Sequence, residues 1–176
     1  MRYLALSLSA LGLLLLYGCR SAAPPAPERL RTAYAPLDRK LRKLVPIDSF
    51  TISAVEAYQL PEAVFLDARE RQEYEVSHLP GARYLGFSTP DTTAVKALSH
   101  NTPLVVYCTV GYRSARLAQE LRRAGFKRVY NLYGSIYAWR LAGLPLVDAA
   151  GPTPNIHTYN RKWGRFIPDT LGTKVY

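Results

Sequence analysis

Residues 105–121 read VVYCTVGYRSARLAQEL, and this stretch decides the fold. β-Branched and aromatic residues predict a strand that ends at Cys108, and a helical pattern begins at Arg113. The cysteine therefore lies between the carboxyl end of a buried strand and the N-terminus of a helix. Unpaired N–H groups and the helix dipole favour negative charge there, so this position favours the nucleophilic thiolate.

The four residues between Cys108 and Arg113 predict a tight loop that closes onto the helix. Such a loop can aim several backbone N–H groups at one point and form an anion-binding nest. Gly111 allows a backbone conformation that other residues resist, and Arg113 adds a permanent positive charge. A sulfur anion at the centre of the nest would be stabilised, and so would a persulfide formed on it.

Strand-like and helix-like segments alternate on both sides of this stretch. Strands are expected within residues 49–52, 63–67, 78–85, 102–108 and 128–132. Helices are expected within residues 53–60, 69–75, 89–99, 113–125 and 135–143. Ser53 and Glu56 fit a capping box, and Gly125 and Gly143 are typical helix stops. The alternation predicts an α/β protein with an open, largely parallel sheet flanked by helices on both faces, in which ligands bind beyond the carboxyl ends of strands.

Residues 1–18 resemble a bacterial lipoprotein signal peptide. Arg2 supplies a short positive region, and residues 4–16 form an apolar stretch that is too short to span a bilayer comfortably. The stretch ends in LYGC, which resembles a lipobox with Cys19 as the lipidated residue, although Tyr17 stands where a small residue is usual. The alternative is an ordinary cleaved signal followed by a coincidental cysteine.

Lipidation would anchor the mature chain to a membrane of the cell envelope through a diacylglycerol group on Cys19. Arg20 is not the aspartate that typically retains lipoproteins in the inner membrane, so we expect the outer membrane, facing the periplasm or the surface. The chain has two cysteines, and lipidation of Cys19 leaves Cys108 without a partner in its own chain. An odd thiol of this kind is reactive, paired with another chain, or buried and inert.

Two segments precede the alternating region. Residues 19–28 form a Pro/Ala-rich tether, and residues 29–45 form a basic helical collar. Within the collar Leu37, Leu41 and Leu44 follow helical spacing, and a proline fits the first turn. Either these leucines dock on the domain, or the collar lies against anionic lipid near the anchor.

A C-terminal extension, residues 148–176, follows the alternating region. Its aromatic residues alternate with basic ones: Tyr159, Arg161, Lys162, Trp163, Arg165 and Phe166. Either the aromatic side chains pack back on the domain as an extra layer, or they form an arm that binds a partner.

The net charge is +10, which favours anionic partners in general. The positive charge is spread over several segments without a recognised nucleic-acid motif, so we expect no nucleic-acid partner. The three histidines, His78, His100 and His157, lie far apart in the sequence and lack paired metal-ligand spacing. No phosphate-loop or dinucleotide glycine pattern is present, so we expect neither a metal nor a cofactor.

Four ordered motifs resemble the single-domain rhodaneses, a family of sulfurtransferases. CTVGYRS fits their active-site loop C-x-x-G-x-R-S, and LDARERQEY, SHLPGA and LYGSIYAWRLAGLPL resemble three further motifs. The resemblance covers residues 46–147, which we expect to form a rhodanese-like domain. The sequence also resembles exported rhodanese-like proteins of the Bacteroidetes group. Ser77 and Ser135 replace glycines of the family pattern outside the loop, so we expect them to affect local geometry more than chemistry.

The resemblance implies a role for each candidate site residue. Cys108 would attack the sulfane sulfur of a small anionic donor, such as thiosulfate or a persulfide, and pass it to a thiol acceptor or cyanide. The substrate-binding loop would consist of Thr109, Val110, Gly111, Tyr112, Arg113 and Ser114. Supporting residues would be Asp67, Arg69 and His78, the first two as an ion pair and the last within a structural turn.

Loop length separates two kinds of enzyme that resemble this pattern. Four residues lie between Cys108 and Arg113, whereas the related cell-cycle phosphatases have five, which widens the loop to hold a phosphate. We therefore expect sulfur transfer rather than phosphatase activity. A non-catalytic rhodanese-like module for binding or redox sensing stays open, and the sequence does not indicate an oligomeric state.

Overall fold

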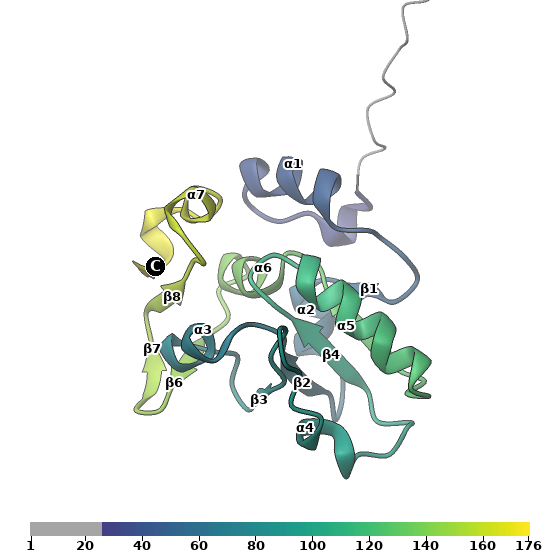
Figure 1. The fold of residues 1–176 in the computed structure, drawn as a ribbon. Coiled ribbons are helices and arrows are strands. Elements are labelled where there is room, and N and C mark those ends of the chain that lie inside the picture. Colours follow the sequence, from purple (N-terminus) through teal and green to yellow (C-terminus); the bar gives the residue numbers. More distant parts are fainter. Residues whose placement is uncertain (1–25) are drawn as a thin grey trace, which may run out of the picture.

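The computed structural model describes residues 26–176 and has a five-stranded sheet at its centre (Figure 1). The strands are β1 (Thr51–Ile52), β2 (Val64–Asp67), β3 (Arg83–Tyr84), β4 (Leu104–Tyr107) and β5 (Val129–Leu132). They lie in the order β1-β5-β4-β2-β3, and every pairing is parallel. The predicted α/β architecture is confirmed, and Cys108 follows the central strand at the carboxyl edge of the sheet.

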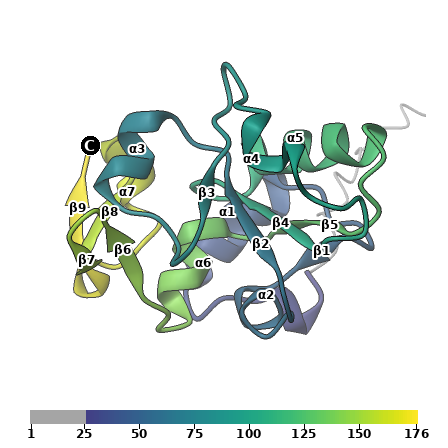
Figure 2. The ribbon, with the colours of Figure 1, turned by 90° about the horizontal axis from the view of Figure 1, so that it is seen from below.

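Helices cover both faces of the sheet, as predicted (Figure 2). On one face lie α4 (Thr93–Lys96) and α5 (Tyr112–Arg123), and on the other lie α1 (Ala35–Leu44), α2 (Ala54–Tyr58) and α6 (Ser135–Leu141). The alternation of side chains along β4 separates the two layers. Val105 and Tyr107 join the core that contains residues of α1, α2 and α6, whereas Cys108 joins the core that contains residues of α5.

Local signals in the sequence set the helix ends. The capping box at α2 is present: Ser53 Oγ accepts the Glu56 N–H at 3.3 Å, and the Glu56 carboxylate accepts the Ser53 N–H at 2.8 Å. The helices α5 and α6 end at Arg123 and Leu141, each two residues before the glycine predicted to stop it. The reciprocal bonds between Ser53 and Glu56 satisfy N–H groups that the start of a helix leaves unpaired.

The basic segment before the sheet packs on the domain. It contains a short 3-10 helix, η1 (Glu28–Leu30), and α1, whose Leu37 and Leu41 are fully buried. The prediction that the leucines dock is therefore confirmed for these two. The predicted signal peptide, Cys19 and most of the tether lie outside the described residues. Within residues 26–176, no helix is both long and apolar enough to cross a membrane.

The C-terminal extension forms an additional layer beside α3 (Arg71–Val76), at the edge of the molecule shown in yellow (Figures 1 and 2). Its first strand, β7 (Gly151–Thr153), forms a β-hairpin with β6 (Leu146–Asp148), which begins within the segment predicted as the rhodanese-like domain. The extension also contains the parallel pair β8 (Asn155–His157) and β9 (Thr173–Val175) and two short helices, α7 (Arg161–Gly164) and η2 (Asp169–Leu171). Ile156 and Ile167 are buried in the core shared with α1, and Trp163 and Phe166 pack against it. The prediction that aromatics of the extension pack back on the domain is confirmed for these two.

Candidate active site

Cys108 lies directly after β4 and before the N-terminus of α5. Only 1% of its surface is exposed, and its Sγ accepts the backbone N–H of Gly111 at 3.1 Å. Gly111 is the N-cap of α5 and has a left-handed backbone (φ 108°). A Cβ there would also lie 3.3 Å from the carbonyl oxygen of Leu132 and 3.3 Å from a methyl group of Val45. Both conformation and space therefore favour glycine at this position.

The surroundings of Cys108 favour its thiolate. Burial raises the pKa of the thiol, but the charge of Arg113 and the backbone N–H groups of Ser114 and Gly111 together outweigh burial and lower it. The first residues of α5 supply these N–H groups, because a helix leaves its first donors without intrahelical partners. The loop predicted from the sequence as an anion-binding nest thus converges on one sulfur atom.

The hydroxyl of Ser114 braces the loop rather than the sulfur. Ser114 Oγ lies 3.7 Å from Cys108 Sγ but only 2.7 Å from Asn131 Oδ1. A hydroxyl has a single proton to donate, and the shorter contact to the amide oxygen takes it. Asn131 in turn donates its amide N–H to the carbonyl oxygen of Gly111 at 3.2 Å. This residue of β5 therefore ties the middle of the loop and its last residue to the neighbouring strand.

Ser135 contacts Cys108, although the sequence places it outside the loop. Its Oγ accepts the backbone N–H of Cys108 at 3.0 Å, donates to the Leu132 carbonyl at 3.0 Å and lies 4.0 Å from Cys108 Sγ. Its backbone is left-handed (φ 48°), a conformation that a non-glycine residue adopts at a cost. The expectation that Ser135 affects local geometry more than chemistry left out this contact with Cys108. Neighbouring parallel strands β4 and β5 bring the two residues together.

Arg113 is held by Glu73, a partner that the sequence reasoning missed. Arg113 donates from Nη1 and Nη2 to the two carboxylate oxygens of Glu73 at 2.6 and 2.9 Å. The hydroxyl of Thr109 accepts from Arg113 at 3.0 Å and donates to Glu73 at 3.2 Å. Burial raises the pKa of Glu73, but the bonds and charge of Arg113 outweigh it and lower that pKa. The pair clamps the loop onto α3.

The three residues expected as supports lie away from the pocket. Asp67 and Arg69 form a fully buried ion pair with 2.7 Å between the closest atoms, and Arg69 also donates to the Ser77 carbonyl at 2.6 Å. His78 stacks on the Tyr74 ring, with 3.9 Å between centroids. Its Nδ1 lies 3.0 Å from the Tyr74 carbonyl, which only accepts, so Nδ1 carries the proton. All three brace the segment that connects β2 to β3 and contains α3.

A cavity of about 520 Å³ opens at Cys108, whose low exposure places the sulfur at its floor. Val110, Tyr112 and other loop residues form one wall. Leu44 of α1 and two residues of the C-terminal extension, Tyr159 and Trp163, also line it. The sequence left both flanking segments without an assigned place at the site. The structure brings both to the mouth of the cysteine pocket.

His157 lies behind the Glu73–Arg113 pair. Its Nδ1 is 3.9 Å from a Glu73 carboxylate oxygen, but the same nitrogen accepts the backbone N–H of Tyr159 at 3.1 Å. Burial lowers the pKa of His157, and the nearby arginines lower it further against the opposing effect of Glu73. An accepting Nδ1 has no proton, so His157 is neutral and does not form an ion pair with Glu73.

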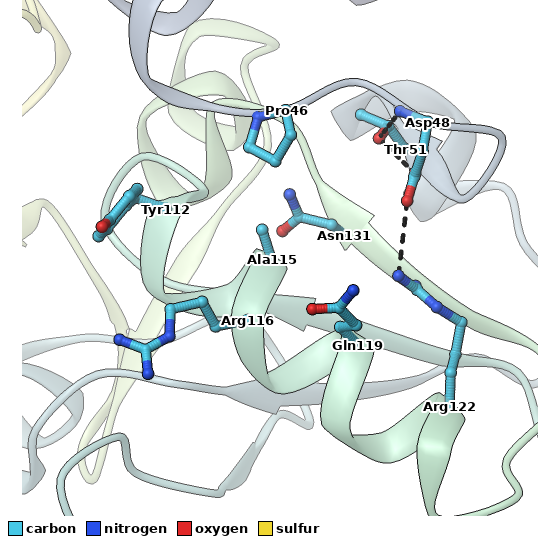
Figure 3. A pocket seen from close by; sticks show the side chains of 9 residues that line it. All are labelled: Pro46, Asp48, Thr51, Tyr112, Ala115, Arg116, Gln119, Arg122 and Asn131. Carbon is cyan, nitrogen blue, oxygen red and sulfur yellow. Dashed lines mark hydrogen bonds and ion pairs between the residues drawn. The ribbon is translucent and has the colours of Figure 1, made fainter.

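A second, smaller cavity of about 260 Å³ lies along α5, on the side of Asn131 and Asp48 (Figure 3). Arg122 reaches across it to Asp48, with 3.5 Å between the closest atoms. Cys108 is not among its lining residues and instead lines the larger cavity. Within residues 26–176, no three His, Cys, Asp or Glu side chains gather where they could hold a metal ion.

Comparison with known proteins identifies this arrangement. The family model of the rhodanese-like domain matches residues 53–142. The chain belongs to the rhodanese-like domain family. It is 36% identical over 101 residues to the thiosulfate sulfurtransferase GlpE of Coxiella burnetii, an alignment that covers 56% of this chain and 92% of that protein.

Solved structures show the same rhodanese-like fold. The rhodanese-like domain of the Anabaena protein Alr3790 has a TM-score of 0.52 at 24% identity, covering 57% of this chain and 80% of that one. A thiosulfate sulfurtransferase of Pseudomonas aeruginosa has a TM-score of 0.50 at 29% identity, covering 61% of this chain and 21% of that one. The rhodanese-like part of this chain thus resembles proteins named as sulfurtransferases, and α1 and the C-terminal extension are built onto it.

Proposed function

We propose that the protein moves a sulfane sulfur from thiosulfate or a persulfide donor to a thiol or cyanide acceptor through a persulfide on Cys108. The observation that carries this proposal is the position of Cys108 Sγ, 3.1 Å from the Gly111 N–H at the start of α5 and at the floor of an open pocket. A lowered thiol pKa supplies the nucleophile, and the pocket admits a donor.

The reaction divides into two displacements. The Cys108 thiolate attacks the outer sulfur of the donor, a new S–S bond forms, and the remainder of the donor leaves with the electron pair, as sulfite when the donor is thiosulfate. The persulfide anion then occupies the position that the loop N–H groups stabilise. An acceptor thiolate attacks its outer sulfur and regenerates the Cys108 thiolate. Two separate displacements predict ping-pong kinetics.

The direct test is to detect the intermediate on the full-length chain. Incubation with a sulfane-sulfur donor is expected to increase the mass of the protein by one sulfur atom, and a thiol acceptor should reverse the increase. The variant Cys108→Ser should gain no sulfur while keeping the circular dichroism spectrum of the wild type. Equal turnover in that variant would rule out Cys108 as the carrier, whereas no turnover in the wild type would favour a non-catalytic binding or redox-sensing module.

We also propose that the mature chain is a lipoprotein of the cell envelope, held through a diacylglycerol on Cys19. The LYGC sequence after an apolar run supports this proposal. Expression of Cys19→Ser in the native host should shift the protein from the membrane fraction to a soluble or uncleaved form. Wild-type protein without acyl chains in that fraction would contradict the proposal.

A further inference from the structure

We infer that the Cys108 pocket takes sulfur compounds with an apolar or aromatic body in preference to small dianions, and that Tyr159 and Trp163 of the C-terminal extension contact that body. This inference rests on the proposed sulfur transfer and specifies its substrate class. Neither residue belongs to the part of the chain, residues 53–142, that matches the family model.

The size of the pocket is the first argument. Its volume of about 520 Å³ falls within the range of roughly 300–1,000 Å³ that is typical of small-molecule sites. Thiosulfate is a single tetrahedral ion and would occupy only the floor beside Cys108. The remaining space suits a larger group attached to the reacting sulfur.

The walls of that space are apolar and aromatic. They include Leu44 of α1, Phe87, Tyr112 at the start of α5, and Tyr159 and Trp163 of the extension. Aromatic walls bind an apolar or aromatic body by removing its surface from water and by ring contacts. Such walls offer no comparable interaction to a hydrated dianion, which loses its water shell on entry.

The charge of the pocket also disfavours a dianion. Its two charged lining residues are Glu70 and Arg113. Both terminal nitrogens of Arg113 already bind the Glu73 carboxylate, and the Glu70 carboxylate accepts the Ser88 hydroxyl at 2.7 Å. Around the cavity one arginine therefore faces two carboxylates. A second negative charge on the donor finds no free cation among the lining residues.

The two extension residues are held where they can act as a wall. Trp163 packs against the Phe166 ring at 5.6 Å between centroids, and Lys40 of α1 lies 5.1 Å above the indole. Tyr159 has a left-handed backbone (φ 66°), and its ring lies 5.4 Å from the Arg113 guanidinium. A non-glycine residue holds that conformation at a cost, and such residues gather at functional sites.

Two thiosulfonate anions provide a matched pair of donors. Methanethiosulfonate and benzenethiosulfonate have the same reacting group and the same charge, and they differ only in the body. In each case the Cys108 thiolate attacks the sulfane sulfur, the bond between the two donor sulfurs breaks, and the sulfinate leaves with the electron pair. Cys108 then carries the persulfide anion, so atoms and charge balance without an oxidant. Thiosulfate serves as the small dianionic donor.

The experiment compares kcat/KM for the three donors on the full-length chain with one acceptor thiol. For wild type, we expect kcat/KM to be roughly tenfold higher for benzenethiosulfonate than for methanethiosulfonate and lowest for thiosulfate. A ring contact together with burial of the ring contributes about a factor of ten. The ratio of benzene to methane donor should fall toward unity in Trp163→Ala and Tyr159→Ala. It should be largely kept in Trp163→Phe and in the control Tyr176→Ala, which alters an exposed aromatic of the same extension outside the pocket.

Four results would contradict the inference or the proposed function, and they can be told apart. Equal kcat/KM for the two thiosulfonates in wild type, or thiosulfate as the best donor, would overturn the substrate preference and leave sulfur transfer intact. An unchanged donor ratio in both alanine variants would overturn the role of the extension. Transfer from none of the three donors would overturn the proposed function itself. The wild-type ratio needs no variant, so the preference is testable even if a substitution prevents folding.

Discussion

Two arginine–carboxylate pairs are buried in the same part of the molecule, yet only one reaches the pocket. The side chains of Asp67 and Arg69 are both 0% exposed, and the pair joins the last residue of β2 to the segment that follows it. Glu73 is 1% exposed, but 15% of the Arg113 side chain is exposed, and this arginine lines the pocket at Cys108. The first pair joins residues two positions apart, whereas the second joins residues 40 positions apart, on α3 and α5.

The comparison separates a pair that stabilises the fold from a pair that sets the properties of the active site. Burial alone would lower the pKa of Arg69, but Asp67 outweighs it and raises that pKa, so Arg69 stays charged without water. Arg113 keeps part of its surface toward the pocket, fixes the loop through Glu73 and lowers the pKa of Cys108. We call Asp67–Arg69 the sealed pair and Glu73–Arg113 the open pair. Breaking the sealed pair should have the largest effect on stability, and breaking the open pair should also change the pKa of the Cys108 thiol.

Asp67→Ala is expected to have the largest effect, lowering the free energy of unfolding by about 3–5 kcal/mol because it strands a buried charge. Arg69 Nη1 already has no hydrogen-bond partner within the described part of the chain. Urea unfolding measures the loss. The double variant Asp67→Ala/Arg69→Met removes the stranded charge and should recover part of the stability. A double variant that is no more stable than the single one would contradict the claim that the stranded charge of Arg69 causes the loss of stability.

Glu73→Gln is expected to cost less stability, about 1–3 kcal/mol, because Arg113 can still hydrate at the pocket. The amide leaves the charge of Arg113 unopposed, so the pKa of Cys108 should fall further and kcat/KM for thiosulfate should rise. Alkylation rate against pH and donor kinetics report both effects. The control Glu75→Gln changes an exposed carboxylate of the same helix and should alter neither. A higher thiol pKa in Glu73→Gln would contradict the claim that Glu73 opposes the effect of the Arg113 charge on Cys108.

Ser135→Gly should have the smallest effect on stability, below about 1 kcal/mol, because glycine relieves the left-handed backbone while the bond to the Cys108 N–H is lost. Ser135→Ala loses the same bond and keeps the strain, so it should be the less stable of the two. Both variants should transfer sulfur a few-fold more slowly in single turnovers. If alanine is at least as stable as glycine, the strain at this residue is not significant.

Local sequence patterns predicted the sheet, the helix faces and the cysteine loop, because strand alternation, helix caps and the loop glycine act over a few residues. The ion pair of Asp67 and Arg69 was expected from the family resemblance, and its members lie only two positions apart. Arg113 was predicted as a permanent positive charge without an assigned ion-pair partner, because Glu73 comes from a different helix and only tertiary packing brings the two together.

The flanking segments were the least predictable part of the site. The alternation of aromatic and basic residues fitted both a packed layer and a partner-binding arm, because burial of Trp163 depends on the surface that α1 offers it. Ser135 looked peripheral because it is 27 positions from Cys108 in the sequence. The two residues meet because they follow the neighbouring strands β5 and β4. In each case the missing information was a contact between elements that are distant in the sequence.

The most direct test of the central claim is the alkylation rate of Cys108 against pH in the full-length Cys19→Ser chain, where Cys108 is the only thiol. Because the Arg113 charge and the N–H groups of Ser114 and Gly111 outweigh burial, the thiolate should form at lower pH than in a free cysteine. The account predicts an inflection below the reference value of about 8.5. An inflection at or above that value would contradict the claim that this loop holds Cys108 as an activated nucleophile.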